Sequence, residues 1–354
     1  MGDQLTEYRV YTRKRHLFIL GVIVLLLGFM VIGTALGSST MSIREAISAV
    51  AGTGDPVHVQ IVWKIRLPRV CAAVLAGMAL AVSGAAMQSI LRNPLGSPFT
   101  LGISHAAAFG AAFAIVVLGA GPQHSDTSDA VLLFNPYLVS VSAFFWSLFS
   151  TGAILLLVRF RGATPEIMIL TGIILGSLFT AATTVLQYCA DDIQLASIVF
   201  WTFGDLGRAV WRDFIILAAV TLPATAYFVR NSWNYNVLNS GDETAQSLGI
   251  NTNQVRIIGM LIASLTTAVV VSYFGIIAFV GLVVPHIVRI LIGGDEWFLI
   301  PASALFGGWF LLTSDTVART ILAPVVLPVG ILTSFLGAPL FLYLLIKGMQ
   351  RRYW

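Results

Sequence analysis

The chain has 354 residues, of which 57% are hydrophobic and only 10% are charged, and its formal net charge is +4. Because an ordinary soluble domain carries roughly 25% charged residues, this composition excludes a soluble globular protein. The basic surplus does not indicate nucleic acid as a partner, since the sequence has no dense basic run and its arginines gather at the ends of apolar segments.

Nine stretches contain no Asp, Glu, Lys or Arg: 17–43, 70–91, 93–125, 130–158, 167–190, 214–229, 257–288, 297–314 and 320–346. Most of them exceed the roughly 20 apolar residues that a helix needs to cross a bilayer. Spanning segments must satisfy their own backbone hydrogen bonds, and these continuous runs lack the alternating pattern of a β-barrel. The sequence therefore predicts an all-α polytopic membrane protein, with one transmembrane domain over residues 1–354.

Both ends of the chain carry basic clusters, Arg13 to Arg15 before the first apolar run and Lys347 to Arg352 after the last. The positive-inside rule places both termini in the cytoplasm, so the number of spans should be even. The first run is longer than the 7–15 apolar residues of a signal peptide, so we interpret it as a retained span. The region 253–292 is too long for one crossing, and we divide it at Ser272–Gly275. The ten predicted spans are 17–36, 68–90, 99–119, 136–158, 167–189, 213–230, 253–273, 276–292, 297–313 and 326–347.

This topology puts a substantial basic set on the external side: Arg44, Lys64, Arg66, Arg69, Arg208, Arg212 and Arg319. Small residues at Gly77, Ala81, Gly84 and Ala85 form one face of the second span. Such a face lets helices approach closely. We favour packing within the subunit over a dimer seam for this face.

The chain contains no G-x-x-x-x-G-K-[ST] loop, no H-E-x-x-H and no G-x-S-x-G. We therefore predict no catalytic residue, no metal site and no cofactor bound by this chain. His105 and His286 are single histidines in apolar surroundings, expected to be packed or hydrogen-bonded, and Cys71 and Cys189 are expected to be buried apolar side chains. No carboxylate lies near the centre of a predicted span, so the energy for transport should come from another subunit rather than from an ion gradient.

The longest cytoplasmic loop, at about 231–252, contains the pattern of a short capped helix. Ser240 and Glu243 have the spacing of a capping box, and Gly249 can end the helix in a left-handed conformation. A rigid projection of this kind could transmit motion from a partner. A helix lying on the membrane surface explains the same spacing equally well.

Several segments resemble the FecCD-type, or type II, permeases of ABC importers for iron-siderophore, haem and vitamin B12. They are Arg66–Arg69, Gln88–Leu95, Leu101–Ser104, Asp242–Gly249, Gly281–Arg289, Asp315–Arg319, Leu327–Gly330 and Gly337–Pro339. The resemblance implies a ten-span subunit of a homodimer in the cytoplasmic membrane, working with two cytoplasmic ATPase subunits and an extracytoplasmic binding protein. ATP and Mg would then be used by the partner ATPase.

The resemblance also implies roles for particular residues. Arg66, Arg69 and Arg319 would dock acidic residues of the binding protein, and charge reversal at Arg66 plus Arg319 should then weaken docking. The alternatives are contacts with lipid phosphates or ion pairs within the protein, for instance between Arg319 and Asp315 one helical turn back. The residues of the loop helix that would contact the ATPase are Asp242, Glu243, Ala245, Leu248 and Gly249.

The turn between the fourth and fifth spans corresponds to a cytoplasmic gate in the family. Here it contains Thr164, Pro165 and Glu166, which departs from the usual run of small hydroxyl residues. The chain is thus expected to be the permease of an iron-siderophore or haem importer, with vitamin B12 as the alternative cargo. An ion-coupled secondary transporter and a membrane-embedded enzyme are the remaining alternatives, but the sequence has neither the midplane carboxylate nor the catalytic set that they require.

Overall fold

The computed structural model describes residues 2–37, 41–121 and 135–351, and these residues form helices without a strand. In chain order the elements are α1 (Gly2–Ala35), α2 (Ile43–Val50), α3 (Pro56–Ile61), η1 (Val62–Arg66), α4 (Leu67–Ile90), α5 (Ile103–Val116), α6 (Pro136–Arg161), α7 (Pro165–Cys189), α8 (Asp192–Thr202), α9 (Trp211–Arg230), α10 (Ser232–Asn239), α11 (Asp242–Ser247), α12 (Thr252–Phe274), α13 (Val280–Ile292), α14 (Glu296–Thr320) and α15 (Val329–Arg351). The all-α class predicted from the sequence is confirmed.

Among the described residues, seven helical segments are long and apolar enough to cross a membrane: Thr12–Ala35, Pro56–Ile90, Pro136–Phe160, Pro165–Cys189, Trp211–Arg230, Thr252–Phe274 and Glu296–Thr320. Three shorter apolar helices, Ile103–Val116, Val280–Ile292 and Val329–Tyr343, lie at the other predicted positions. Each predicted span therefore overlaps a helix. The number of actual crossings stays a prediction.

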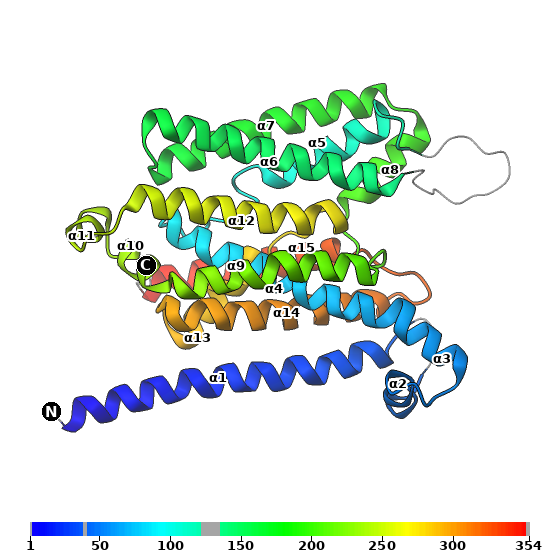
Figure 1. Cartoon of the computed structure of the whole chain (residues 1–354), viewed down its shortest axis with the longest axis horizontal. Helices are drawn as coiled ribbons and strands as arrows, with labels where there is room; N and C mark the ends of the chain where they lie inside the picture. Colours follow the sequence, from blue (N-terminus) through cyan, green and yellow to red (C-terminus); the bar gives the residue numbers. More distant parts are fainter. Residues whose placement is uncertain (1, 38–40, 122–134, 352–354) are drawn as a thin grey trace.

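The long helices lie side by side and alternate in direction, so the connections gather at two opposite ends of the bundle (Figure 1). One end, which we call the α11 face, carries α10, α11, the start of α1 and the α6–α7 turn. The other, the α2 face, carries α2, α3, α8 and the loop before α9. The end of α15 lies on the α11 face with the start of α1, as an even number of spans requires.

The core of the bundle is α4, which is buried along nearly its whole length. A Cβ added at Gly84 would collide with the carbonyl of Gly281 in α13, and one at Gly77 with the carbonyl of Gly307 in α14. These close approaches are what a small-residue face permits. The predicted packing of this face within the subunit is therefore confirmed.

The predicted division of 253–292 is also correct. Helix α12 ends at Phe274, Gly275 adopts a φ of 74°, and α13 begins at Val280. A positive φ costs glycine little because it has no Cβ. The segment between the helices is held by Asp205, whose backbone N–H donates to the carbonyl of Phe274 at 2.8 Å.

Candidate functional site

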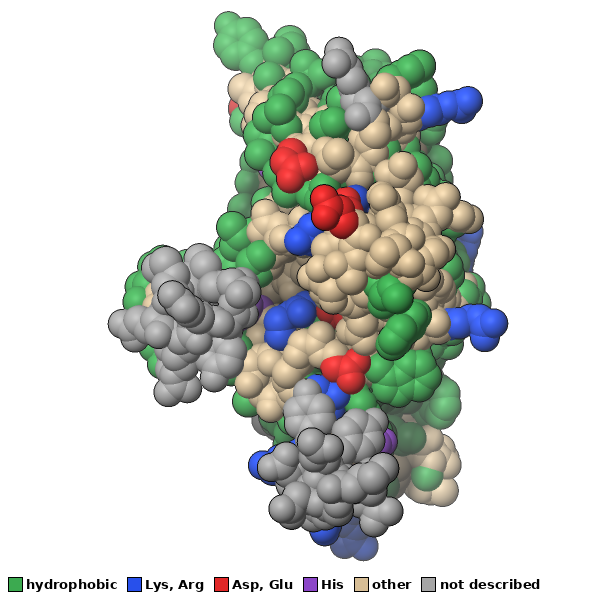
Figure 2. All heavy atoms as spheres, turned by 90° about the vertical axis from the view of Figure 1, so that its left-hand side faces the viewer, with side chains coloured by type: hydrophobic (Ala, Val, Ile, Leu, Met, Phe, Trp, Pro, Cys, Tyr) green, Lys and Arg blue, Asp and Glu red, His purple; other side chains and the backbone are tan. Residues whose placement is uncertain are grey.

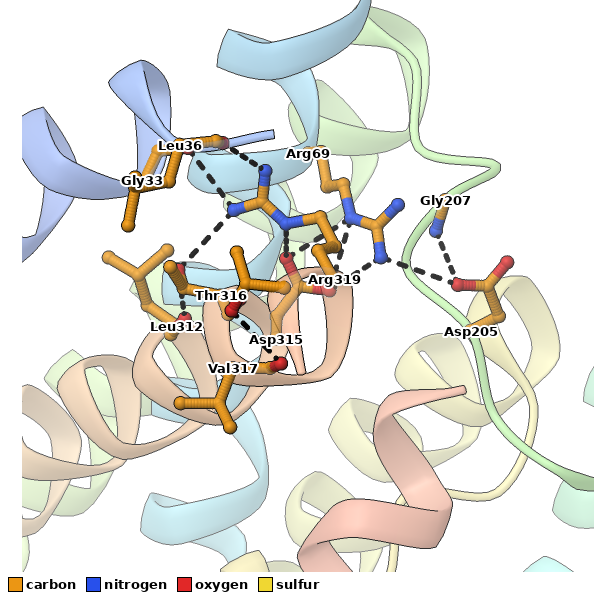
Figure 3. A network of polar contacts seen from close by, with 11 residues as sticks. Gly33, Leu36, Arg69, Asp205, Gly207, Leu312, Asp315, Thr316, Val317 and Arg319 are labelled. Carbon is orange, nitrogen blue, oxygen red and sulfur yellow. Dashed lines mark hydrogen bonds and ion pairs between the residues drawn. The ribbon is translucent and has the colours of Figure 1, made fainter. Parts of the chain in front are cut away.

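Two arginines, Arg69 of α4 and Arg319 of α14, meet at Asp315 near the end of α14 (Figure 3). The Nε of Arg69 donates to both oxygens of Asp315 at 3.1 Å, and its Nη2 lies 2.8 Å from Oδ1. The Nε of Arg319 lies 3.1 Å from Oδ2 of the same residue, whose side chain is fully buried. One carboxylate is thus shared by two guanidinium groups.

Arg319 and a third arginine, Arg66, hold the end of α1. Arg319 donates to the carbonyls of Leu36 and Gly33 at 3.0 and 3.1 Å. Arg66 donates to those of Thr34 and Ala35 at 2.9 and 2.6 Å. These contacts satisfy carbonyl groups that have no partner within the last turn of a helix. The internal pairing of Arg319 with Asp315, given above as the alternative to docking, is present, and the docking role of the three arginines stays a prediction.

Asp315 also qualifies the expectation of a carboxylate-free interior. The predicted span ended at residue 313, whereas α14 continues to Thr320 and includes Asp315. The side chain lies near the end of the helix and is paired with Arg69 and Arg319. A paired carboxylate near a helix end is a structural ion cluster rather than an unpaired midplane group of the kind that ion coupling requires.

On the α11 face, α11 is a helix of six residues that projects from the bundle (Figure 1). Glu243 and Leu248 are exposed, and Ala245 is fully buried. The N–H of Ile250 donates to the carbonyl of Ala245, and that of Gly249 to the carbonyl of Gln246, both at 2.9 Å. This is a Schellman motif, and the predicted left-handed cap at Gly249, with a φ of 81°, is confirmed.

The predicted capping box at Ser240 is wrong. The N-cap of α11 is Gly241, with a φ of 115° and no side-chain cap. Ser240 instead follows α10 as its C-cap, and its hydroxyl faces the carbonyl of Asn236 at 3.5 Å. The sequence spacing alone did not show that a second helix, α10, occupies 232–239 and takes Ser240 for its own end.

Asp242 begins α11, and its side chain, which is 36% exposed, binds Arg256 of α12; its contact with an ATPase stays a prediction. Its oxygens accept from Nη1 and Nη2 of Arg256, each at 2.7 Å, and Arg92 lies 3.6 Å away. The hydrogen bonds from Arg256 lower the pKa of Asp242, and this effect exceeds the opposing effect of burial. The middle of the α11 face shows mainly backbone and uncharged side chains that are not hydrophobic, with single acidic and basic side chains among them (Figure 2).

The predicted gate residues form the start of α7. Thr164 is the N-cap, and its hydroxyl accepts from the N–H of Ile167 at 3.4 Å. Pro165 occupies the first helical position, where its missing N–H costs nothing, and Glu166 lies exposed in the first turn. Sequence reasoning therefore placed the turn correctly, and the structure shows why Pro165 and Glu166 stand there.

A hollow of about 710 Å³ opens between the segment after α4, the start of α5 and α7. Its polar lining residues are Asn93, Thr100, His105, Ser177 and Thr180, and the rest is apolar or glycine. The Nδ1 of His105 is buried without a hydrogen-bond partner, and its ring contacts Phe99 with 5.1 Å between centroids. His105 is therefore packed as predicted, but it borders a space of ligand size.

Two other expectations concerned metal and cysteine chemistry. Among the described residues, no group of three or more His, Cys, Asp or Glu could hold a metal ion. Cys71 is half-buried, but Cys189 is exposed at the end of α7, so its predicted burial is wrong. An apolar sequence run indicates a span but does not say which side of the helix faces lipid.

Comparison with known proteins identifies relatives of this chain. The FecCD transport family matches residues 24–347. A protein of Methanocaldococcus jannaschii that is provisionally named an ABC transporter permease is 53% identical, over 98% of both chains. The hemin transport system permease HmuU of Yersinia pestis is 38% identical over 96% of this chain and 98% of its own. The cobalamin import permease BtuC of Halobacterium salinarum is 36% identical over 80% and 73%.

A solved structure shares the fold. It is described as the inward-facing conformation of an ABC transporter provisionally assigned to the metal-chelate type. Its TM-score is 0.81 at 31% identity, over 93% of this chain and 98% of the other. The arrangement of helices described above is thus that of an ABC permease.

Proposed function

Since the chain belongs to the FecCD transport family, we propose that it is the permease subunit of an ATP-driven importer whose cargo is an iron complex, either a siderophore or haem. Members of this family are ABC permease subunits rather than enzymes. ATP hydrolysis then belongs to a separate cytoplasmic subunit. The observation that carries the proposal is α11, an exposed short helix that has a closed C-terminal cap and is bound through Asp242 to the buried Arg256.

The α11 face is the surface on which the ATPase would dock. Glu243 and Leu248 project outward from α11, whereas Ala245 and Asp242 hold the helix to the bundle. A helix that is fixed to the bundle can transmit movement of the ATPase, because it cannot move independently of the bundle. This assignment makes the α11 face cytoplasmic, and with it the start of α1 and the end of α15.

The α2 face would receive the extracytoplasmic binding protein. Arg66, Arg69 and Arg319 are largely buried there, so we propose that they hold this platform together while exposed side chains make the first contacts. The exposed basic residues of the face are Arg44, Lys64, Arg208 and Arg212. The indole N–H of Trp211 donates to the carbonyl of Trp63 at 2.8 Å, which brings Lys64 and Arg212 to one region. Acidic Glu45 and Asp55 lie on the same face, so the surface is mixed in sign and suits the setting of docking register.

The cargo is bulky in this proposal because the hollow beside His105 lies in the range of ligand pockets, 300–1,000 Å³. Its walls offer apolar and small polar groups, which bind a large complex weakly and permit its release. Haem and siderophore complexes both fit that chemistry. Vitamin B12 is the second candidate, supported by the cobalamin import permease among the relatives.

We expect two copies of the chain to flank a shared path, with two ATPase subunits and one binding protein. The test is reconstitution of the complete transporter with its binding protein in proteoliposomes. Uptake of an iron complex that depends on ATP and persists without an ion gradient is the expected result. Accumulation by the chain alone, driven by protons or sodium, would overturn the proposal.

A further inference from the structure

Arg256, in the first turns of α12, joins three separate parts of the α11 face through one buried side chain, which is 2% exposed. Its Nη1 and Nη2 hold the carboxylate of Asp242 in α11, each at 2.7 Å. Its Nη1 also donates to the carbonyl of Ala163 at 3.1 Å, and its Nε to that of Ile90 at 3.2 Å. The guanidinium therefore contacts α11, the α6–α7 turn and the end of α4 at the same time.

The rest of the attachment of α11 is slight. The helix lies between Gly241 and Gly249, both at positive φ, so the backbone can turn at either end. Ala245 is its buried residue, and Gln246 donates to the hydroxyl of Thr252 at 3.4 Å. Within the described part of the chain, Asp242 makes the ion pairs that connect α11 to the bundle. The orientation of α11 thus depends mainly on Asp242 and Arg256.

The ion pair between Arg256 and Asp242 is bidentate, which is a strong geometry. Two parallel N–H···O bonds between guanidinium and carboxylate fix direction as well as distance. Breaking the pair would leave a buried guanidinium without its counter-ion, which is costly. A force on α11 should therefore move Arg256 with it rather than separate the two.

The contact with Ala163 continues the connection to the predicted gate. Ala163 is buried and directly precedes Thr164, the N-cap of α7. Displacement of Arg256 would therefore move the carbonyl of Ala163, and with it the residues at which α7 begins. The N-terminus of α7 in turn borders the hollow through Ile169 and Gly172.

We propose that Arg256 is the positioning residue through which movement of α11 reaches the α6–α7 turn, because its guanidinium binds Asp242 and the Ala163 carbonyl together. The inference rests on the proposed function, in which α11 receives the ATPase. It adds a specific connection between that docking helix and the predicted gate at Thr164–Glu166. Arg92 lies 3.6 Å from Asp242, but its side chain is 44% exposed. We therefore do not assign it this connecting role.

The test uses the complete transporter with its co-purified ATPase, in a background where Cys71 and Cys189 are replaced by Ser. A bimane fluorophore on Glu166→Cys, an exposed position, reports the environment of the turn. In the wild-type background, ATP with vanadate should change its emission. In Arg256→Lys, which keeps the charge but cannot make all these contacts, ATPase activity should stay within about twofold while the emission change falls about fivefold, the low end of usual allosteric coupling.

Three further variants separate coupling from folding. Asp242→Asn removes the counter-ion of Arg256 but keeps its contacts with Ile90 and Ala163, and its size-exclusion profile checks folding. The folded variant should show the same loss, and Asp242→Glu should restore the response in part. Arg92→Ala is the matched control and should respond like wild type. A full emission change in Arg256→Lys or Asp242→Asn would overturn the inference. No ATP-dependent change in the wild-type background would overturn the proposed function itself.

Discussion

Asp315 and Arg319 stand one helical turn apart in α14, and Nε of the arginine lies 3.1 Å from Oδ2 of the aspartate. Arg69 approaches the same carboxylate from α4 at 2.8 Å. Two positive groups therefore share one buried negative group, and this cluster also holds the C-terminal end of α1. The arginines of this motif serve first to assemble the α2 face.

Replacing Asp315 with Asn should be strongly destabilising. Two buried guanidinium groups would lose their counter-ion, and removing one partner of a buried pair costs about 3–5 kcal/mol. Unfolding of the detergent-solubilised protein would measure the loss. Asp205→Asn is the matched control, because Asp205 lies 3.6 Å from Arg69 and its side chain is 32% exposed. Equal stability of the two variants would contradict this account.

Gly84→Ala should destabilise the bundle, whereas Gly21→Ala should not. A Cβ at Gly84 meets the backbone of Gly281, while a Cβ at Gly21 has no neighbour within 4 Å. Overpacking of this kind usually costs about 1–3 kcal/mol, and α4 and α13 must separate to relieve it. Unfolding midpoints of the two variants in the same detergent test the difference. A Gly84→Ala variant as stable as wild type would show that the two helices can move apart freely.

Leu248→Ala and Glu243→Ala should each weaken the link between ATP hydrolysis and uptake. Leu248 is 61% exposed and Glu243 is exposed, so neither change should affect folding. The measurement is the ratio of cargo taken up to ATP hydrolysed in proteoliposomes. Ser247→Ala, an exposed change in the same helix, should leave the ratio unchanged. If Leu248→Ala and Ser247→Ala behave alike, the outward side of α11 is not the ATPase contact.

The ion pair between Asp242 and Arg256, which holds α11, should persist in mild acid. The pKa of Asp242 is lowered from 3.8 in the folded chain, so this carboxylate binds its proton more readily when unfolded. Its stabilising effect is complete above that ordinary value and is lost as the pH falls through the lower, folded value. Amide-exchange protection at Ala245 and Ile250 should therefore persist from neutral pH to about pH 5. In Asp242→Asn the protection should already be low at neutral pH, and early loss in the wild type would contradict the pairing.

Charge reversal at Arg44 plus Lys64 should weaken capture of the binding protein without unfolding the permease. We expect the Kd to rise about tenfold, or about 1.4 kcal/mol, with the effect shrinking at high salt. The pair Arg66→Glu plus Arg319→Glu should instead reduce the yield of folded protein, because both side chains are buried. A pull-down combined with size-exclusion profiles distinguishes the two results. Normal folding of the second pair with lost docking would restore the direct docking role of those arginines.

The sequence predicted the positions of the helices well because span length and the absence of charge are local properties. It also predicted the break after Phe274 and the cap at Gly249, because a glycine at each place can adopt a positive φ. It could not predict that Arg66 would reach the carbonyls of Thr34 and Ala35. That contact depends on which helix lies beside η1, and the order of apolar runs does not contain that information.

Arg256 lies inside the predicted span 253–273, and its role was not predicted. An arginine within an apolar span is costly and is retained for a partner. An arginine in such a position indicates an anionic partner, which the structure identifies as Asp242.

Arginine contacts fasten the apolar part of α1, Thr12–Ala35, to the α13–α14 region at both of its ends. Near the start of this part, Arg15 donates to Asp295 at 2.7 Å and to the carbonyl of Ile292 at 2.9 Å. At its far end, Arg319 of α14 grips the carbonyls of Leu36 and Gly33. Contacts at two separate heights restrict both sliding and rotation of α1 relative to α14. We therefore expect α1 and α14 to move as one rigid body during a transport cycle, with the hinges elsewhere in the bundle.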